Sequence, residues 1–347
     1  MVSPENRVID RHPSGKKPHR SWRDFPLFGG NMCFFWWTWL IGFFGAVGLV
    51  AAASHWAREQ VKRRQQDHLV ILYCAQDQFF AESILAEFTL STGIAVKPIF
   101  DSEAVKTVGL ANRLLAERDH PVCDVFWGNE EFRTRQLAAS GVFRETNGWA
   151  AFGQRSRRLV INTNRLALAD YPHSLIELTN SHWQGRVALA FPLFGTTATH
   201  LLALRGRWGE SNWLVWTRAL AANRPFLEEG NSHVVQRVAR GEALVGLTDS
   251  DDIESGRREG LPVVALAIGP ELLLMPNTVA LIRGGPHPAA AQKLFDFLQT
   301  PAVHERLVAA AALETETAAT PTLQPDWTAL LRDLDRATGQ LGEVFRR

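Results

Sequence analysis

The chain has 347 residues, with 37 Lys and Arg against 36 Asp and Glu, and 46% of its residues are hydrophobic. This length exceeds what one hydrophobic core usually organises, so we expect two lobes or domains. The formal net charge of +1 provides no basic surface for a nucleic-acid partner, and the hydrophobic share excludes a largely disordered chain.

The first apolar segment is long enough to cross a bilayer. Residues 32–54 follow a basic segment, 1–31, and no charged residue occurs between Met32 and Ala53. About 20 apolar residues span a membrane, which predicts an N-terminal transmembrane helix that leaves 1–31 in the cytoplasm. Three alanines before Ser54 also resemble a signal-peptidase site, so cleavage after Ala53 is the alternative. Under either interpretation the rest of the chain is periplasmic, anchored to the inner membrane or released.

Strands and helices alternate after a polar linker at 55–67. A first set has expected strands at 68–75, 94–100 and 123–128, with helices at 78–91 and 102–118. A strand at 158–164 leaves this set. The second set has expected strands at 186–192, 243–249 and 262–268, with helices at 197–208, 211–222 and 233–240. A strand at 274–282 returns to the first set, and helices at 288–298, 301–309 and 327–338 close the chain. Short apolar strands joined by helices predict an α/β fold.

Three sequence stretches follow one another in a specific order. The first runs from Leu72 to Val142, the second contains FPLFGTTATH and later GEALVGLTDSDD, and the third contains GGPHPAAAQKLFDFL. In this order they resemble the type II periplasmic solute-binding proteins of ABC importers, in particular the ferric-iron binders. The resemblance implies a two-lobed fold with mixed sheets and hinge strands. Lobe 1 would comprise 68–160 plus 277–347, and lobe 2 would comprise 161–276.

The resemblance also implies a function. Such a protein is a monomer that captures a solute between its lobes and delivers it to an ABC permease and its ATPase. It is not an enzyme, and the sequence contains no nucleophile elbow, zinc motif or P-loop. A membrane-tethered sensor that closes on its ligand without transport is the alternative that the N-terminal segment keeps open.

Candidate ligand-binding residues follow the strands, because open α/β sheets bind ligands beyond the carboxyl ends of their strands. They are Gln76, Asp77, Asp101, Asn129, Glu130, Gly195, Thr196, Thr197, Asn231, Ser232, Asp249, Asp251, Asp252 and Asn277. The other interpretation of many of them is a helix cap or a solvated turn. Gly195 to Thr197 begins a predicted helix, where backbone N–H groups favour an anion, and the relatives hold their synergistic anion there.

The segment Thr248 to Asp252 departs from the iron binders, which carry a tyrosine pair where this sequence has Asp251 and Asp252. Carboxylate oxygens still suit a hard cation. The relatives also place a ligating Glu in the loop after the third strand, where the nearest matches are Asn129 and Glu130. We therefore expect Asp251, Asp252 and Glu130 to hold Fe3+ or another metal ion with an accompanying anion, and no cofactor is required. Aspartates also receive an organic ammonium group, so a small organic cation or a phosphate- or phosphonate-bearing solute remains the alternative ligand.

Overall fold

The structure, a computed structural model, describes residues 49–50, 52–58, 68–101, 108–315 and 322–346. Two compact units divide the chain, Met1–Val61 and Lys62–Arg347, and the fold described below is that of the second unit. The cytoplasmic segment expected at 1–31 and most of the membrane segment expected at 32–54 lie outside the described residues. No helix within the described ranges has the length and apolar character needed to cross a membrane.

A sheet of five strands forms the first half of this unit, which we name lobe 1. Its strands are β1 (Leu69–Cys74), β2 (Ala95–Phe100), β3 (Val125–Gly128), the first half of β4 (Trp149–Asn162) and β9 (Leu274–Leu281). β1 pairs in parallel with β2 and β3, whereas β9 runs antiparallel to β3 and β4. The accompanying helices are α2 (Gln78–Thr92), α3 (Val108–Ala116), α4 (Glu131–Ala139), α9 (Pro288–Leu298) and α10 (Pro301–Ala309).

A second sheet forms lobe 2. Its strands are the second half of β4, β5 (Val187–Ala190), β6 (Phe226–Glu228), β7 (Val245–Asp249) and β8 (Val263–Leu266). Its main helices are α5 (Gly195–Trp208), α6 (Glu210–Ala222), α7 (Asn231–Ala239) and α8 (Ser250–Arg258). Short 3-10 helices occur at Leu168–Asp170, Ile176–Thr179, Ser181–Trp183 and Gly269–Glu271. The α/β architecture expected from the sequence is therefore present.

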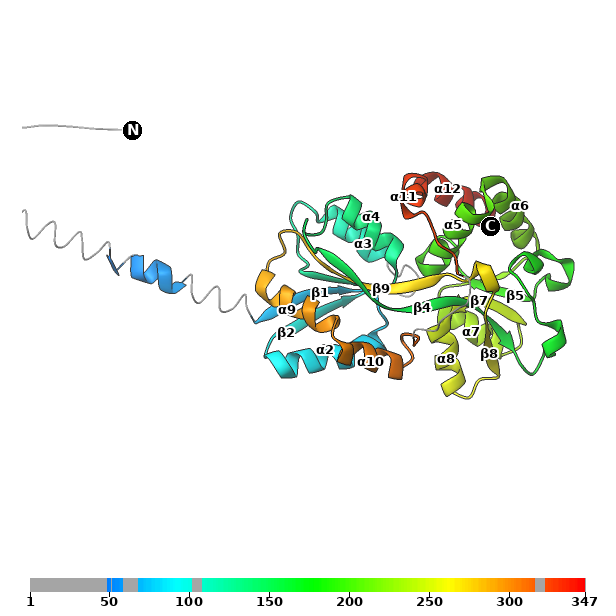
Figure 1. Ribbon diagram of the computed structural model, residues 1–347, viewed down its shortest axis with the longest axis horizontal. Helices are drawn as coiled ribbons and strands as arrows, with labels where there is room; N and C mark the ends of the chain where they lie inside the picture. The colour runs from blue at the N-terminus through cyan, green and yellow to red at the C-terminus, as the bar shows by residue number, and fades with distance from the viewer. Residues whose placement is uncertain (1–48, 51, 59–67, 102–107, 316–321, 347) are drawn as a thin grey trace, which may run out of the picture. The chain divides into compact units, whose positions relative to one another are not determined.

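The long strand β4 connects the two lobes (Figure 1). Its first half, up to Ser156, pairs with β9, and its second half, from Arg157, pairs with β7 and β8. The sequence predicted a strand only from Arg158, because the preceding residues are polar or small. A bulge at Gly153, whose φ of 58° suits glycine, separates the paired stretches around it. The crossing from one lobe to the other therefore falls between Ser156 and Arg157.

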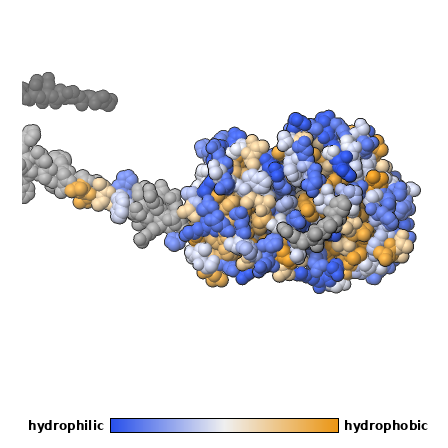
Figure 2. Space-filling view, viewed as in Figure 1, coloured by the Kyte–Doolittle hydropathy of each residue, from blue (hydrophilic) through white to orange (hydrophobic). Residues whose placement is uncertain are grey.

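Apolar strands are buried on both faces, as expected for parallel strands covered by helices. In lobe 1, the side chains of β1 divide between two clusters, with Leu72 packing on one face and Tyr73 on the other. Local signals set several helix ends. Gly93 ends α2 in a left-handed conformation, and the Thr300 side chain caps α10 before Pro301. On the face shown in Figure 2, hydrophilic residues predominate and apolar areas are small.

The last two helices pack mainly on lobe 2, and the first of them also contacts α4 of lobe 1, where Trp327 stacks on Phe132. α11 (Trp327–Arg332) and α12 (Leu334–Phe345) share one hydrophobic cluster with Trp213 and Trp216 of α6. Asp333, between the two helices, accepts a hydrogen bond from Arg205 of α5 at 3.0 Å. The sequence had assigned all of 277–347 to lobe 1 and had predicted one helix at 327–338. The difference arises because the apolar face of α12 is covered by α5 and α6.

Candidate functional site

A small cavity lies where strand ends of both lobes meet. Lobe 1 contributes Asp77 after β1 and Asn129 after β3. Arg155 of β4 also lines the cavity. Lobe 2 contributes the rest of the lining, which consists of Ala190, Phe191, Phe194, Gly195, Thr196, Thr197, Glu229, Gly230, Asn231, Asp249, Asp251 and Asp252. Its free volume is about 30 Å³. One water needs about 10–15 Å³ on this measure, so the cavity accommodates an ion or two waters in this lobe arrangement.

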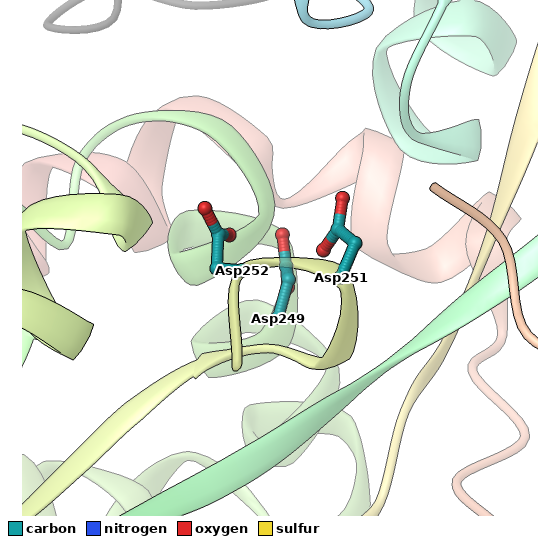
Figure 3. Close-up of side chains that lie close together, drawn as sticks. All are labelled: Asp249, Asp251 and Asp252. Atoms are coloured by element: carbon teal, nitrogen blue, oxygen red, sulfur yellow. The ribbon is translucent and has the colours of Figure 1, made fainter. Parts of the chain in front are cut away.

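Three carboxylates gather at one side of the cavity. Asp249 ends β7 and precedes α8, whereas Asp251 and Asp252 lie in the first turn of that helix. One oxygen atom from each lies within 4.8 Å of the others, and Figure 3 shows the three side chains pointing to the same side of the chain. The positive end of the α8 dipole favours anionic groups at this position. The acidic residues therefore cluster at the beginning of a helix, whereas the other interpretation of the sequence was a solvated turn.

Asp249 is engaged by groups of its own protein. Its Oδ1 accepts from Arg157 Nη1 at 2.7 Å, and its Oδ2 accepts from Thr196 Oγ1 at 2.8 Å and from Asn231 Nδ2 at 3.0 Å. Burial opposes ionisation of Asp249, but the charges of Arg157 and Arg155 outweigh it and hold its pKa below the usual range. Asp249 is therefore an ionised structural group, and little of its hydrogen-bonding capacity is left for a ligand.

Arg157 joins the parts of lobe 2 that form the cavity. The side chain is 0% exposed. Its Nη1 donates to Thr196 Oγ1 at 3.1 Å and to Asn231 Oδ1 at 3.0 Å, and its Nη2 donates to Thr197 Oγ1 at 3.0 Å. These partners begin α5 and α7, and Asp249 ends β7. One buried guanidinium thus fixes three chain segments relative to β4, with the planar geometry that suits arginine for multiple contacts.

Arg155 lies two residues before Arg157 on the same face of β4. Its Nε donates to Asp249 Oδ2 at 3.3 Å and lies 3.6 Å from Asp251 Oδ1. Its Nη1 donates to Asn277 Oδ1 of β9 at 3.4 Å. The amide nitrogen of Asn277 is buried and has no hydrogen-bond partner among the residues that the structure describes. Arg155 therefore places a positive charge inside an otherwise acidic cavity.

Comparison with known proteins identifies the family. The model of a family described as "Bacterial extracellular solute-binding protein" matches residues 69–310. The chain belongs to this family. The major ferric iron-binding protein of Neisseria meningitidis is 26% identical over 200 residues, covering 52% of this chain and 58% of the relative. The Fe(3+)-binding periplasmic protein of Serratia marcescens is 29% identical over 202 residues, covering 52% and 56%. The chain thus spans less than three fifths of these curated relatives.

Solved structures share the fold of this solute-binding protein. Iron-bound HitA from Pseudomonas aeruginosa has a TM-score of 0.69 at 20% identity, covering 80% of this chain and 99% of HitA. AfuA from Actinobacillus pleuropneumoniae, with fructose-6-phosphate bound, has a TM-score of 0.70 at 17% identity, covering 79% and 97%. These similarities show the type II periplasmic binding protein fold that the sequence resemblance implied.

Most residues singled out from the sequence of this solute-binding protein lie at the cavity. Those that line it are Asp77, Asn129, Gly195, Thr196, Thr197, Asn231, Asp249, Asp251 and Asp252. Asn277 contacts Arg155 from the next strand, and Gln76 is buried beside Asp77. Asp101 and Ser232 do not line the cavity: Asp101 accepts a hydrogen bond from the backbone of Leu110 in α3, and Ser232 is exposed. The candidates at strand ends thus separate into cavity residues and helix-end residues.

Glu130 differs most from its expected role as a metal ligand. It is fully buried and accepts from the backbone N–H groups of Phe132 and Arg133 at 2.7 and 3.0 Å, so it caps α4. It also accepts from Thr199 Oγ1 of α5 at 3.2 Å, a contact between the two lobes. Burial raises its pKa. Its oxygens serve the protein, and it is absent from the cavity lining, so the structure removes it from the metal set.

Two cavity residues, Arg155 and Glu229, were missed from the sequence, and so was Arg157, which holds Asp249 behind the cavity. The arginines belong to the segment QRSRR, in which alternate residues of a strand share one face. That alternation was the available signal. It went unused because the predicted strand began at Arg158, after both residues.

Proposed function

We propose that this protein captures a hard metal cation, ferric iron being the first choice, between its lobes and delivers it to an ABC permease. The observation that carries the proposal is that Asp251 and Asp252 both line the cavity, with one carboxylate oxygen of each within 4.8 Å of the other. Oxygen ligands of this type suit hard cations. The names of the curated relatives, which describe ferric iron-binding proteins, support the same class of ligand.

The charges around the cavity favour a cation. Arg157 balances Asp249 through their direct hydrogen bond. The remaining charged side chains that line the cavity are one guanidinium, that of Arg155, and four carboxylates, those of Asp77, Glu229, Asp251 and Asp252. Their formal charges sum to −3. A site with this balance attracts positive charge, and the attraction is strongest near the buried Asp251, because Coulomb energies rise as the dielectric constant falls. Carboxylates here take the place that phenols occupy in the ferric binders of the resemblance.

An accompanying anion is part of the proposal. The start of α5, with Gly195, Thr196 and Thr197, faces the cavity and offers the positive end of a helix. A small anion there would complete the coordination of a cation held by Asp251 and Asp252. A protein of similar fold, IdiA (FutA) from Trichodesmium, was solved in complex with iron and citrate (TM-score 0.63, 16% identity, 80% of this chain and 100% of that chain covered).

We also propose a place in the cell and a way of working. The relatives include a periplasmic protein by name, and the N-terminal apolar segment would tether this chain to the outer side of the inner membrane. Binding would close the lobes over the ligand, since a ligand that contacts both lobes stabilises the closed form. A permease and its ATPase are the partners in this scheme. Tethered sensing without transport is the competing scheme, and transport of bound cation into vesicles with the permease separates the two.

A melting experiment tests the ligand. The full chain, purified in detergent and stripped with a chelator, is melted with Fe3+ citrate, Ca2+, La3+, spermidine or fructose-6-phosphate. We expect at least one metal cation to raise the melting temperature by mass action on the folded state. Spermidine and fructose-6-phosphate represent the organic-cation and phosphate alternatives. Each of these two solutes, like iron citrate, needs more room than the free volume of about 30 Å³, so binding of any of the three requires a wider lobe separation.

Paired variants locate the effect. Asp251→Asn with Asp252→Asn removes two charges from the cavity and should abolish the metal-dependent shift. Glu254→Gln with Glu259→Gln removes two charges from the outer end of the same segment, where Glu254 pairs with Arg257, and should keep the shift. Full metal binding by the aspartate variant would reject the site. A shift with fructose-6-phosphate alone would reject the metal and support a phosphate-bearing solute.

A further inference from the structure

Arg155 is an unusual neighbour for a cation site. Among the described residues that line the cavity, it is the only Lys or Arg, and it is 3% exposed. It faces Asp249 and Asp251 in lobe 2 and Asn277 on β9. A buried charge persists only where partners compensate its lost hydration. Its position therefore depends partly on Asp251, one of the two carboxylates that would bind the ligand.

The two carboxylates beside Arg155 differ in how closely they approach its Nε. Asp249 Oδ2 accepts a hydrogen bond from its Nε at 3.3 Å, whereas Asp251 Oδ1 lies at 3.6 Å from the same nitrogen. Asp249 has Arg157 as a closer partner, at 2.7 Å. When Asp251 turns to a ligand, Asp249 and Asn277 remain as hydrogen-bond partners of Arg155. Asp251, in turn, has a cation beside it before any ligand arrives.

We propose that Arg155 determines specificity as an internal counter-cation: it balances Asp251 in the empty site and competes with the metal ion for that carboxylate. This inference rests on the proposed metal function and deepens it. The guanidinium lowers the affinity of the site and limits the charge that the site accepts. A ligand that brings its own anion is favoured over the bare ion, because the anion offsets the repulsion from Arg155.

Coulomb's law gives the pattern expected when the charge is removed. The repulsion between Arg155 and a bound ion is proportional to the ion's charge. The change in binding free energy should be about 1.5 times as large for La3+ as for Ca2+, because the ion's charge is 1.5 times as large. If Arg155→Gln strengthens Ca2+ binding by about tenfold, it should therefore strengthen La3+ binding by about 30-fold. If Arg155 instead binds the ligand's anion, Arg155→Gln should weaken ligand binding.

The test measures Kd for Ca2+ and La3+ by titration calorimetry on the full chain in detergent. We expect Arg155→Gln to bind both ions more tightly, with the larger gain for La3+. Arg155→Lys keeps the charge and should stay within about threefold of the wild type. Arg218→Gln, which removes one exposed charge from α6, is the matched control and should leave both Kd values unchanged. Unchanged or weaker binding by Arg155→Gln would overturn the inference while leaving the proposed function intact.

A measurement on the wild-type protein covers the case in which Arg155→Gln does not fold. The Nε–H resonance of Arg155, assigned by its loss in Arg155→Lys, reports the surroundings of this group, with Asp249 Oδ2 at 3.3 Å and Asp251 Oδ1 at 3.6 Å, in a proton–nitrogen correlation spectrum. Saturating La3+ should shift this resonance as Asp251 moves to the ion. A resonance that stays in place while the protein binds La3+ would overturn the inference. A wild-type chain that binds no metal ion would overturn both the inference and the proposed function.

Discussion

Replacing Arg157 by Met removes the guanidinium that joins β4 to three other segments of lobe 2. The side chain donates to Asp249, Thr196, Asn231 and Thr197 and is fully buried. Breaking a buried ion pair on one side costs about 3–5 kcal/mol, because the other charge stays buried. Asp249 keeps its weaker contact with Arg155, so we expect a loss of about 3 kcal/mol in the free energy of unfolding.

Urea unfolding followed by tryptophan fluorescence measures this loss. Arg237→Met is the matched control, because Arg237 pairs with Glu228 and Glu242 at a partly exposed surface. Pairs of that kind contribute about 1 kcal/mol or less. Adding Asp249→Asn to Arg157→Met removes the stranded charge and should recover about 1 kcal/mol. A loss from Arg157→Met no larger than the control's would refute the view that Arg157 organises the site.

Two further predictions concern stability. Burial, followed by the charge of Arg157, lowers the pKa of His200 to about 3, so this group favours unfolding as the pH falls from its unfolded pKa of about 6.5 towards 3. Between these pH values the free energy of unfolding should fall by about 1.4 kcal/mol per pH unit because of this group. Urea titrations at pH 7 and pH 5 should show that His200→Gln lacks this contribution to the pH dependence. Gly128→Ala places a Cβ against Thr278 Oγ1 and Phe126, so melting should report a loss of about 1–3 kcal/mol, whereas Gly339→Ala, with open space around it, should lose nothing.

Elements with a strong apolar pattern were predictable from the sequence. The helix expected at 78–91 is observed at Gln78–Thr92, and the strand expected at 68–75 is observed at Leu69–Cys74. α8 was not predicted, because its first residues, Ser250 to Asp252, have the composition of a turn. Acidic residues also favour the first turn of a helix. Only the packing of Ile253 and Gly256 into lobe 2 decides between these two outcomes.

The position of the cavity could be predicted from the sequence, but the charged side chains that face it could not. Parallel strands bring their carboxyl ends to one edge, so residues after strands, such as Asp77 and Asn129, were found by that rule together with the resemblance to the iron binders. Which residue at such an end faces the cavity depends on side-chain direction. Glu130 follows Asn129 directly, yet its carboxylate turns back to the N–H groups of α4. A capping residue and a cavity residue have the same sequence signature.

The net charge of the site depends on pairing that only the folded chain establishes. From the sequence, Asp249, Asp251 and Asp252 form one acidic group. In the structure, Arg157 binds Asp249, and Arg155 lies between Asp249 and Asp251. The arginines lie about 90 residues earlier in the chain, on the strand that crosses between the lobes. The net charge of the cavity therefore depends on β4 as well as on the carboxylates, and we expect a substitution of Arg155 to change ligand preference without altering any carboxylate of the cavity.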